Sequence, residues 1–263
     1  KFFNVDRGFL KMKFATINNL RLEYKEWGHN DHKKPIVLMH EGLGCITMWR
    51  EFPQVLAKWT NRRVIAFSRP GYGNSQNYPE PRRTNYLHRE AQQTLPAFLD
   101  YLKVENPVIL GHSDGGSITL IYAASFPQKL SAAIVMAPHE FHEPMMKTSL
   151  EDAVLQFKTT HWRRGLAKHH KDPVRVFEEW SGVWLSDEHK TWNIVDDLKK
   201  ITVPLLAIQG RQDEYATLKQ IEVIANEAPQ TRLLVLDSCR HSPQFDARDR
   251  VLGTIVAFLE NVA

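Results

Sequence analysis

Six short apolar runs alternate along the chain with longer amphipathic segments, and this alternation restricts the fold more than any other feature. The runs contain few polar positions, which is typical of strands buried on both faces, and they span residues 35–40, 62–68, 106–112, 131–137, 203–209 and 231–237. The segments between them have apolar residues at spacings of three and four, which predicts helices over about 47–59, 86–103, 114–126, 215–227 and 245–260. Strands that alternate with helices form parallel sheets covered on both faces. The sequence therefore predicts an α/β fold with a mostly parallel central sheet.

Two parts of the chain depart from this alternation. Residues 20–27 alternate apolar with polar side chains and predict an antiparallel strand at the edge of the sheet. Residues 138–192 are rich in histidine, tryptophan and charge and carry helical patterns without a buried strand, so we expect a helical cap inserted between two strands. The core domain then consists of residues 1–137 and 193–263, a size that one hydrophobic core can support.

Composition argues against several classes of function. The 34 Lys and Arg residues are spread among 30 Asp and Glu residues, so the net charge of +4 creates no basic tract for nucleic acid. The longest apolar run, AAIVMAP, is about a third of the roughly 20 residues that a membrane-spanning helix needs. We therefore expect neither a nucleic-acid partner nor a membrane span.

The cysteines and the first residues bear on the compartment. Cys45 and Cys239 lie far apart and lack the spacing of metal ligands, which argues against a disulfide framework and a zinc site and favours a reducing cytoplasm. Asp6, Arg7 and Lys11 interrupt the apolar pieces of the N-terminal segment, so no secretory signal is expected there. The chain does not begin with Met, which leaves a removed leader open.

The most specific local motif follows the strand predicted at 106–112. Gly111 and Gly115 flank Ser113 in a G-x-S-x-G arrangement, and the apolar helix predicted from Asp114 follows at once. Small residues at these positions permit a sharp turn from strand to helix that holds the serine hydroxyl outward. The start of the helix directs N–H groups toward the place where negative charge develops in acyl transfer. Ser113 is therefore the candidate nucleophile.

From this motif outward, nearly the whole chain resembles the α/β-hydrolase superfamily, in the form of a carboxylesterase-like serine hydrolase with a helical cap. The resemblance implies a serine, an acid and a histidine in that chain order. Asp213, just after the strand at 203–209, matches the position of the acid, with its neighbour Glu214 as the alternative. His241, in the loop after the strand at 231–237, matches the position of the base. The resemblance requires no cofactor.

The same resemblance implies an oxyanion hole. One donor is expected to be the N–H of Asp114, the residue after the nucleophile, and the other comes from the loop after the strand at 35–40. That loop reads His40-Glu41-Gly42-Leu43-Gly44, and we assign the second donor to Gly42, while Glu41 and Leu43 stay open as alternatives. Glu41 stands where the family usually has glycine. Because an inward carboxylate would disfavour an oxyanion, we expect it to point outward or to pair with a basic group.

Other polar and aromatic residues are assigned by their place in the chain. His40 and His112 are expected to hold the nucleophile region by hydrogen bonds, and the glycines of residues 69–75 are expected to shape a turn. In the segment 138–143, two histidines flank two carboxylates, but the spacing is not that of a helical metal site, so a polar pocket wall is favoured over a metal. Glu41, Leu43, His139 and Trp180 are the candidate substrate contacts. The tryptophans of the segment are nevertheless expected mainly in the core of the cap; they are Trp162, Trp180, Trp184 and Trp192.

Taken together, the sequence favours a serine hydrolase that acts on small to medium carboxylic esters, with a small molecule as its substrate and no metal or organic cofactor. A carbon–carbon bond hydrolase, a lactonase, an aminopeptidase related to proline iminopeptidases and a haloperoxidase-like side activity use the same residues. A small-ligand receptor that keeps the triad is the alternative from another class. A homodimer is allowed, since such an interface leaves no clear trace in one sequence.

Overall fold

A computed structural model describes residues 11–260 and 262; the N-terminal stretch for which no secretory signal is expected lies largely outside this part. One sheet runs through the described residues in the order β1-β2-β4-β3-β5-β6-β7-β8. Its strands are β1 Lys13–Ile17, β2 Leu20–Trp27, β3 Ile36–Met39, β4 Val64–Phe67, β5 Val108–His112, β6 Ala132–Met136, β7 Leu205–Gly210 and β8 Thr231–Leu236. β3 to β8 pair in parallel and β1 and β2 are antiparallel. All six predicted strands and the α/β class are confirmed, but burial on both faces holds for only five of them: β8 is the other edge strand, and only Leu234 and Leu236 of it are buried.

The prediction that residues 20–27 form the sheet edge is wrong. β2 pairs with β1 on one side and with β4 on the other, so β1 occupies the edge. Ile17 pairs with Leu20, which leaves a two-residue hairpin loop of Asn18 and Asn19, both with positive φ, at 49° and 64°. Asparagine tolerates this left-handed backbone, and an Asn-Asn pair is the sequence signal that could have revealed β1.

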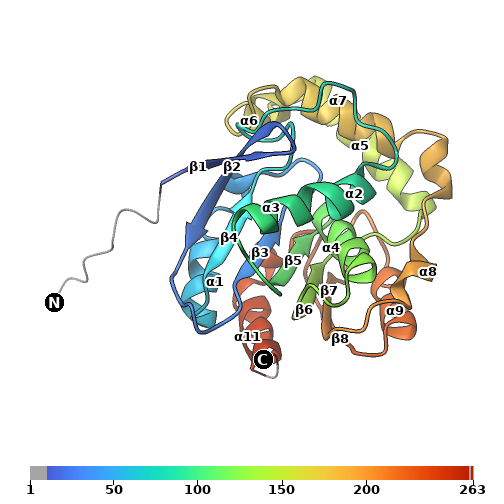
Figure 1. The fold of residues 1–263 in the computed structure, drawn as a ribbon. Helices are drawn as coiled ribbons and strands as arrows, with labels where there is room; N and C mark the ends of the chain where they lie inside the picture. Colours follow the sequence, from blue (N-terminus) through green and yellow to red (C-terminus); the bar gives the residue numbers. More distant parts are fainter. Residues whose placement is uncertain (1–10, 261, 263) are drawn as a thin grey trace.

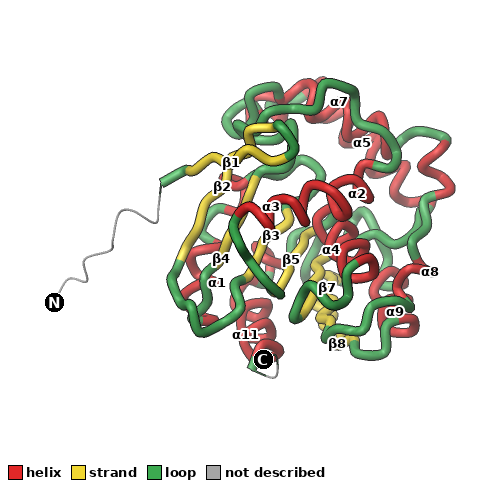
Figure 2. The backbone as a smooth tube through the Cα atoms, in the orientation of Figure 1, coloured by secondary structure: helices red, strands yellow, loops and turns green. Residues whose placement is uncertain are grey.

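Helices cover both faces of the sheet (Figures 1 and 2). Apolar residues alternate between the two faces along the buried strands: Ile36 and Leu38 pack with α1 and α11, whereas Val37 and Met39 pack with α3, α4 and α9. The helices are α1 Phe52–Thr60, α2 Tyr86–Arg89, α3 Leu95–Tyr101, α4 Asp114–Ser125, α5 Pro144–Thr159, α6 Trp162–Leu166, α7 Pro173–Trp184, α8 Val195–Leu198, α9 Lys219–Glu227, α10 Pro243–Asp246 and α11 Arg248–Leu259. A π-helical turn, Glu90–Thr94, joins α2 to α3, so the predicted helix over 86–103 is continuous to Tyr101.

Three predicted helices are shorter or interrupted. The segment 47–59 is a 3₁₀ turn, Ile46–Trp49, followed by α1, with a break at Arg50, whose φ is 53°. The segment 245–260 is divided at Ala247. The predicted helix from Tyr215 begins only at Lys219, because the backbone of Ala216 and Thr217 binds side chains of Gln209 and Glu143 instead of forming a helical turn.

The chain between β6 and β7 forms helices α5, α6 and α7, which lie above the carboxyl ends of the parallel strands (Figure 1). The two ends of this segment meet, since the N–H of His142 donates to the carbonyl of Trp192 and the N–H of Ile194 donates to that of Glu140. We call residues 138–192 the helical layer. No helix of the described residues is long and apolar enough to span a membrane.

Close packing of α4 on the sheet sets the position of its first turn. A Cβ atom on Gly115 would lie 2.0 Å from the carbonyl oxygen of Met39, at the end of β3. A Cβ atom on Gly111 would lie 2.0 Å from the carbonyl oxygen of Gly115 itself. Since real side chains do not approach so closely, both positions of the G-x-S-x-G motif require glycine for backbone packing.

The Gly115→Ala substitution is therefore expected to destabilise the fold by about 1–3 kcal/mol, because the added methyl group forces α4 away from β3. Urea unfolding followed by circular dichroism measures this change. The matched control is Gly253→Ala in α11, where a Cβ meets no atom within 4 Å, so alanine should stabilise the helix by about 0.5–1 kcal/mol. Equal effects of the two substitutions would contradict this account of the packing.

Candidate active site

Ser113 lies at the sharp turn between β5 and α4. Its backbone has φ 53° and ψ −119°, a conformation that costs free energy for any residue with a side chain. The N–H of Ser113 donates to the carbonyl of Met136 at 2.9 Å, and the Ser113 carbonyl accepts the N–H of Ser117 at 3.0 Å, so both neighbouring elements hold the turn. The strained turn presents the Ser113 hydroxyl at the carboxyl end of the sheet, below the helical layer.

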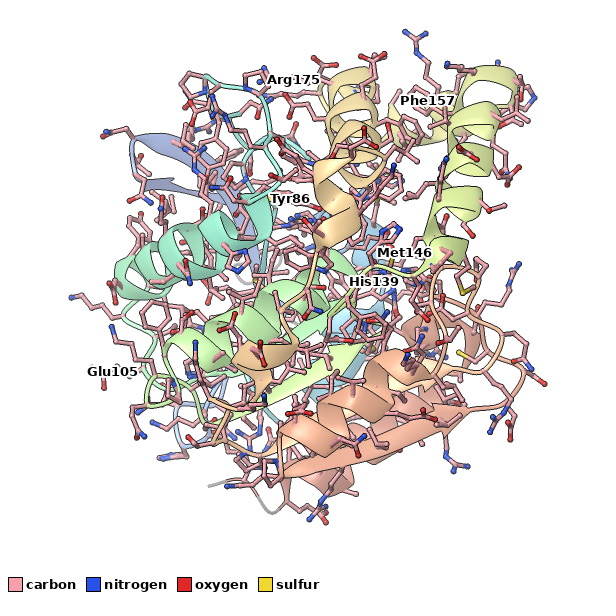
Figure 3. All side chains as sticks on the ribbon, turned by 90° about the vertical axis from the view of Figure 1, so that its right-hand side faces the viewer. Tyr86, Glu105, His139, Met146, Phe157 and Arg175 are labelled. Carbon is pink, nitrogen blue, oxygen red and sulfur yellow. The ribbon has the colours of Figure 1, made fainter. Side chains whose placement is uncertain are left out.

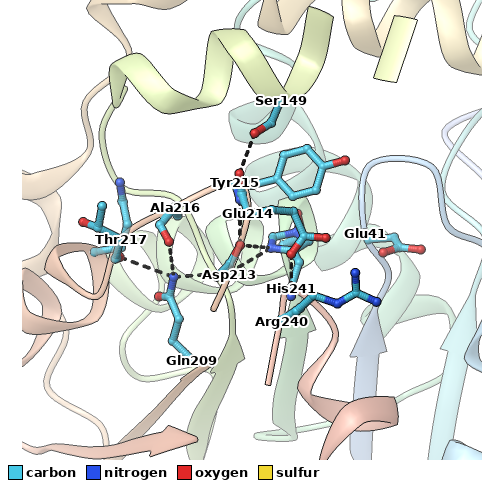
Figure 4. A network of polar contacts seen from close by, with 12 residues as sticks. Glu41, Ser149, Gln209, Asp213, Glu214, Tyr215, Ala216, Thr217, Arg240 and His241 are labelled. Carbon is cyan, nitrogen blue, oxygen red and sulfur yellow. Dashed lines mark hydrogen bonds and ion pairs between the residues drawn. The ribbon is translucent and has the colours of Figure 1, made fainter. Parts of the chain in front are cut away.

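The loops after β7 and β8 bring an acid and a histidine to this serine. His241 Nε2 lies 2.9 Å from Ser113 Oγ, and His241 Nδ1 lies 2.9 and 3.0 Å from the two carboxylate oxygens of Asp213. The Asp213–His241 contact is drawn in Figure 4. The structure thus joins the three predicted catalytic residues in one hydrogen-bonded chain that runs from acid to histidine to serine.

Asp213, and not its neighbour Glu214, contacts the imidazole ring. One Asp213 oxygen accepts the N–H of Tyr215 at 2.9 Å and the other accepts Gln209 Nε2 at 3.2 Å, which holds the carboxylate against His241 (Figure 4). Glu214 accepts the backbone N–H of His241 at 3.2 Å. Glu214, the alternative acid, therefore stabilises the loop that carries His241. Gln209, which was not predicted as a site residue, holds the Asp213 carboxylate in place.

The charges at this site favour an ion pair of Asp213 and His241. Burial acts to raise the pKa of Asp213, but the charge of His241 and hydrogen bonds from His241 and the Tyr215 N–H outweigh it and hold that pKa below its ordinary value. Burial acts to lower the pKa of His241, but the nearby carboxylates of Asp213, Glu41 and Glu214 outweigh it and raise that pKa above its ordinary value. The basicity of His241 is therefore increased by its surroundings.

The loop after β3 is held by its carbonyl groups. The carbonyl of Glu41 accepts His40 Nδ1–H at 2.7 Å and Arg69 Nη2–H at 2.8 Å. Since the C=O and N–H of one trans peptide point in opposite directions, anchoring the Glu41 carbonyl turns the N–H of Gly42 away from Arg69. Among the described residues, neither the N–H of Gly42 nor that of Asp114 has a hydrogen-bond acceptor, and both residues line the cavity that contains Ser113. The two N–H groups are thus available to a ligand.

A buried polar network connects this loop to the helical layer. Arg69, whose side chain is fully buried, also contacts a carboxylate oxygen of Asp114 at 3.4 Å. The same oxygen accepts the hydroxyl of Tyr86 at 2.5 Å, and that hydroxyl accepts Trp184 Nε1–H at 2.8 Å. Tyr86 lies at the start of α2, close to α7 (Figure 3). The groups around both candidate oxyanion donors are therefore tied to α7.

His40 and His112 form structural hydrogen bonds. Besides its bond to Glu41, His40 accepts the backbone N–H of Arg69 at 3.0 Å. His112 Nε2–H donates to the carbonyl of His241 at 2.7 Å, and its Nδ1 accepts Gln244 Nε2–H at 3.1 Å. Burial lowers the pKa of both imidazoles, so both rings are neutral at physiological pH. His112 thereby positions the loop that carries His241.

A cavity of about 260 Å³ opens above Ser113. The four predicted substrate contacts Glu41, Leu43, His139 and Trp180 all line it. Most other residues of the cavity wall were not predicted as substrate contacts, because tertiary packing decides which side of a helix or loop faces a cavity. These residues are Met48, Met146, Leu150, Trp162, Leu166, Trp184, Glu214, Tyr215 and Ser242. Trp162 and Trp184 were expected mainly in the core of the cap, but they also form the pocket wall, whereas Trp192 does not line it.

The segment 138–143 was expected to form a polar pocket wall, but of its histidines and glutamates only His139 lines the cavity. His139 lies against His241, with ring centroids 5.7 Å apart, and burial lowers its pKa to about 3, so it stays neutral beside a charged imidazolium. Burial raises the pKa of Glu140 well above its ordinary value. Glu143 binds Thr217 and Gln220. Within the described part of the chain, no group of three or more His, Cys, Asp or Glu side chains could hold a metal ion.

Comparison with known proteins identifies the family of the chain. A family model described as alpha/beta hydrolase fold matches residues 34–177, more than half of the chain, and the chain belongs to this family. A proline iminopeptidase of Lactobacillus acidophilus is 29% identical over 279 aligned residues, which cover 90% of this chain and 94% of the relative. A 2-hydroxy-6-oxononadienedioate/2-hydroxy-6-oxononatrienedioate hydrolase of Comamonas testosteroni is 21% identical, with 95% and 96% covered. The structure of a putative lipase from Acinetobacter baumannii superposes with a TM-score of 0.80 at 18% identity, with 96% and 91% covered.

If His241 acts as a base, its raised pKa should set the acidic limb of the pH profile. Activity is then lost as the pH falls through a pKa above 6.5, because only neutral imidazole accepts a proton. Glu214→Gln removes one of the charges that raise this pKa while keeping an oxygen for the His241 N–H, so the acidic limb of kcat/KM should move to lower pH. Stopped-flow or steady-state rates between pH 5 and 9 measure the shift.

The control for this experiment is Glu105→Gln. Glu105 is exposed and precedes β5, whereas Ser113 directly follows that strand. The charge of Glu105 therefore lies at the opposite end of the sheet from Ser113, and Figure 3 shows Glu105 far from His139. An equal shift in both variants, or no shift in Glu214→Gln, would show that local carboxylates do not set the basicity of His241.

Proposed function

We propose that the protein is a serine hydrolase that cleaves small to medium carboxylic esters through an acyl-enzyme. The observation that carries this proposal is the hydrogen-bonded chain of Asp213, His241 and Ser113 at the floor of a cavity. An isolated serine hydroxyl is a poor nucleophile at neutral pH, and a positioned base contributes about 10²–10⁴-fold to the rate.

In the proposed reaction, His241 removes the proton of Ser113 as Oγ attacks the ester carbonyl carbon. The carbonyl oxygen becomes an oxyanion, which accepts hydrogen bonds from the N–H groups of Gly42 and Asp114. The tetrahedral intermediate then expels the alcohol, which takes the proton from His241. Water attacks the acyl-enzyme with His241 again as the base, and the carboxylic acid leaves with Ser113 restored. Asp213 holds the ring with Nδ1 protonated and stabilises the imidazolium.

We further propose that residues 138–192 act as a cap that defines the substrate pocket. Met146, Leu150, Trp162, Leu166, Trp180 and Trp184 supply most of the apolar wall, and all of them come from this segment. At about 260 Å³ the cavity is slightly smaller than the roughly 300–1,000 Å³ of typical small-molecule sites. A pocket of this size supports a short or medium acyl or alcohol group.

The charge of the cavity bears on the choice between ester cleavage and carbon–carbon bond cleavage. The name of the Comamonas testosteroni relative denotes dioate substrates, which carry two carboxylates. The cavity of this protein has Glu41 and Glu214 in its wall, and none of the described lysine and arginine residues lines it. Because a carboxylate needs a cationic partner when it leaves water, this wall supports ester cleavage over the cleavage of such carbon–carbon bonds.

Ser113→Ala should lower the turnover of 4-nitrophenyl esters by at least about 10³-fold, and Asp213→Asn by about 10⁴-fold through loss of the correct imidazole tautomer. A series of acyl lengths from acetate to decanoate, read by 4-nitrophenolate absorbance, also maps the pocket, and rates should fall beyond medium chains. Circular dichroism verifies that each variant is folded.

Ser131→Ala is the matched control, because its buried hydroxyl, at the far end of β6 from the site, has no hydrogen-bond partner within the described residues. Full activity of folded Ser113→Ala would overturn the proposal. Tight binding of a small apolar ligand without any turnover by the native chain would instead favour the small-ligand receptor.

A further inference from the structure

Glu41 is built into the wall of the substrate cavity. It directly precedes Gly42, and its side chain lines the cavity with 29% of its surface exposed. Its stem packs on Gly44, where a Cβ atom would lie 2.8 Å from Glu41 Cγ. The loop therefore has room for this side chain only because residue 44 lacks one of its own.

The nearest basic group does not neutralise the Glu41 carboxylate. His112 Nδ1 lies 3.4 Å from Glu41 Oε2, but this nitrogen accepts the amide N–H of Gln244, and the only ring proton of the neutral imidazole is on Nε2, which binds the His241 carbonyl. The pairing expected from the sequence thus places Glu41 beside a basic residue that carries no charge. Among the described residues, no lysine or arginine lies within 4 Å of the Glu41 carboxylate.

The rest of the cavity adds to this negative charge. Asp114 is balanced by Arg69, and Asp213 by His241 when that ring is protonated, whereas Glu214 is a second carboxylate in the wall and has no ion pair within the described part of the chain. Arg240 is exposed and does not line the cavity. A substrate that enters therefore meets two uncompensated carboxylates.

Aromatic rings form the other part of this environment. Trp162, Trp180, Trp184 and Tyr215 all line the same cavity, and Trp180 lies so close to Gly42 that an added Cβ would meet its Nε1 at 2.1 Å. Aromatic faces attract cations through their quadrupole, and carboxylates attract them by charge. Aromatic and carboxylate side chains together are suited to an ammonium group and not to a carboxylate.

We propose that this site prefers esters that carry a cationic amine or quaternary ammonium group, with Glu41 as the main specificity-determining residue and Glu214 as the second. The inference rests on the proposed ester hydrolysis for its reaction, but the charge preference is a property of the cavity and is present in binding as well. Carboxylate-bearing esters are correspondingly rejected.

Isosteric substrates test the charge preference directly. On the acyl side, 4-nitrophenyl 4-(trimethylammonio)butanoate is compared with the neutral 5,5-dimethylhexanoate and with the 4-nitrophenyl monoester of glutarate. On the alcohol side, acetylcholine is compared with 3,3-dimethylbutyl acetate. On at least one side, kcat/KM for the cation should exceed that for its neutral isostere by about tenfold, and the glutarate monoester should be the poorest acyl substrate. The preference should weaken as salt is added.

The variant Glu41→Gln should reduce the ratio of cation to neutral isostere several-fold, and Glu214→Gln should reduce it less. Glu105→Gln, which removes a charge at the other end of the sheet, should leave the ratio as it is in the native chain. Only this ratio is diagnostic, because both cavity glutamates flank the reacting groups and also affect the rate itself.

Binding to Ser113→Ala separates this inference from the proposed function. Quenching of tryptophan fluorescence reports ligand entry, since three tryptophans line the cavity. The dissociation constant of 4-nitrophenyl 4-(trimethylammonio)butanoate should be about tenfold below that of its neutral isostere, and Glu41→Gln in the same background should reduce the difference. Ser113-dependent hydrolysis without a charge preference would overturn the inference alone. If Ser113→Ala binds the cation preferentially but the native chain hydrolyses no ester, the proposed ester hydrolysis is overturned and the preference of the cavity for cations stands.

Discussion

The close approach of α4 to the ends of β3 and β5 is the constraint on which the candidate site depends. Gly111 and Gly115 allow the first turn of α4 to lie against backbone carbonyl groups, and Ser113 takes a positive φ between them. This geometry places Ser113 and Asp114 in the wall of the cavity that Gly42 also lines. A larger residue at Gly111 or Gly115 would push α4 away from the strands, since the backbone atoms that it meets cannot move aside by changing a rotamer.

The buried Arg69 extends this arrangement across three segments. Its guanidinium joins the carbonyl of Glu41 to the carboxylate of Asp114, and Tyr86 connects that carboxylate to Trp184 in α7. All of the hydrogen bonds of this guanidinium are made by Nη2, because Nε and Nη1 of Arg69 have no hydrogen-bond partner among the described residues. A substrate that packs against Trp184 would contact one end of a chain of polar contacts that leads through Tyr86 and Asp114 to Arg69.

Local spacing and the family resemblance together indicated the candidate catalytic residues. Ser113 is marked by its flanking glycines, and Asp213 and His241 each follow a recognisable strand at the positions that the resemblance implies. Leu43 and Trp180 were predicted as substrate contacts, and both line the cavity. The strands were clear from the sequence, because continuous apolar runs have few alternatives in an α/β fold.

Other features depend on contacts between distant segments and left no local trace. In the sequence, Gln209 is only a polar residue at the end of a buried strand, but in the structure its side chain donates a hydrogen bond to the Asp213 carboxylate. Arg69 belongs to a predicted glycine turn, but its guanidinium donates to the carbonyl of Glu41 and so holds the loop that contains Gly42. β1 was missed because its five residues are weakly apolar and its Asn18-Asn19 hairpin was not used as evidence. The inward faces of α5 and α7 were not predicted, since helical periodicity defines an apolar face but not its partner.

The central claim is that Ser113 is an activated nucleophile, and covalent labelling tests it most directly. An alkyl 4-nitrophenyl phosphonate offers a phosphorus atom that a serine oxygen attacks with loss of 4-nitrophenolate, and the product resembles the tetrahedral intermediate. The account predicts release of one equivalent of 4-nitrophenolate per chain and an adduct that peptide mass spectrometry locates on Ser113, with labelling much slower in His241→Ala. An adduct on another residue, or labelling of Ser113 that is equally fast without His241, would contradict it.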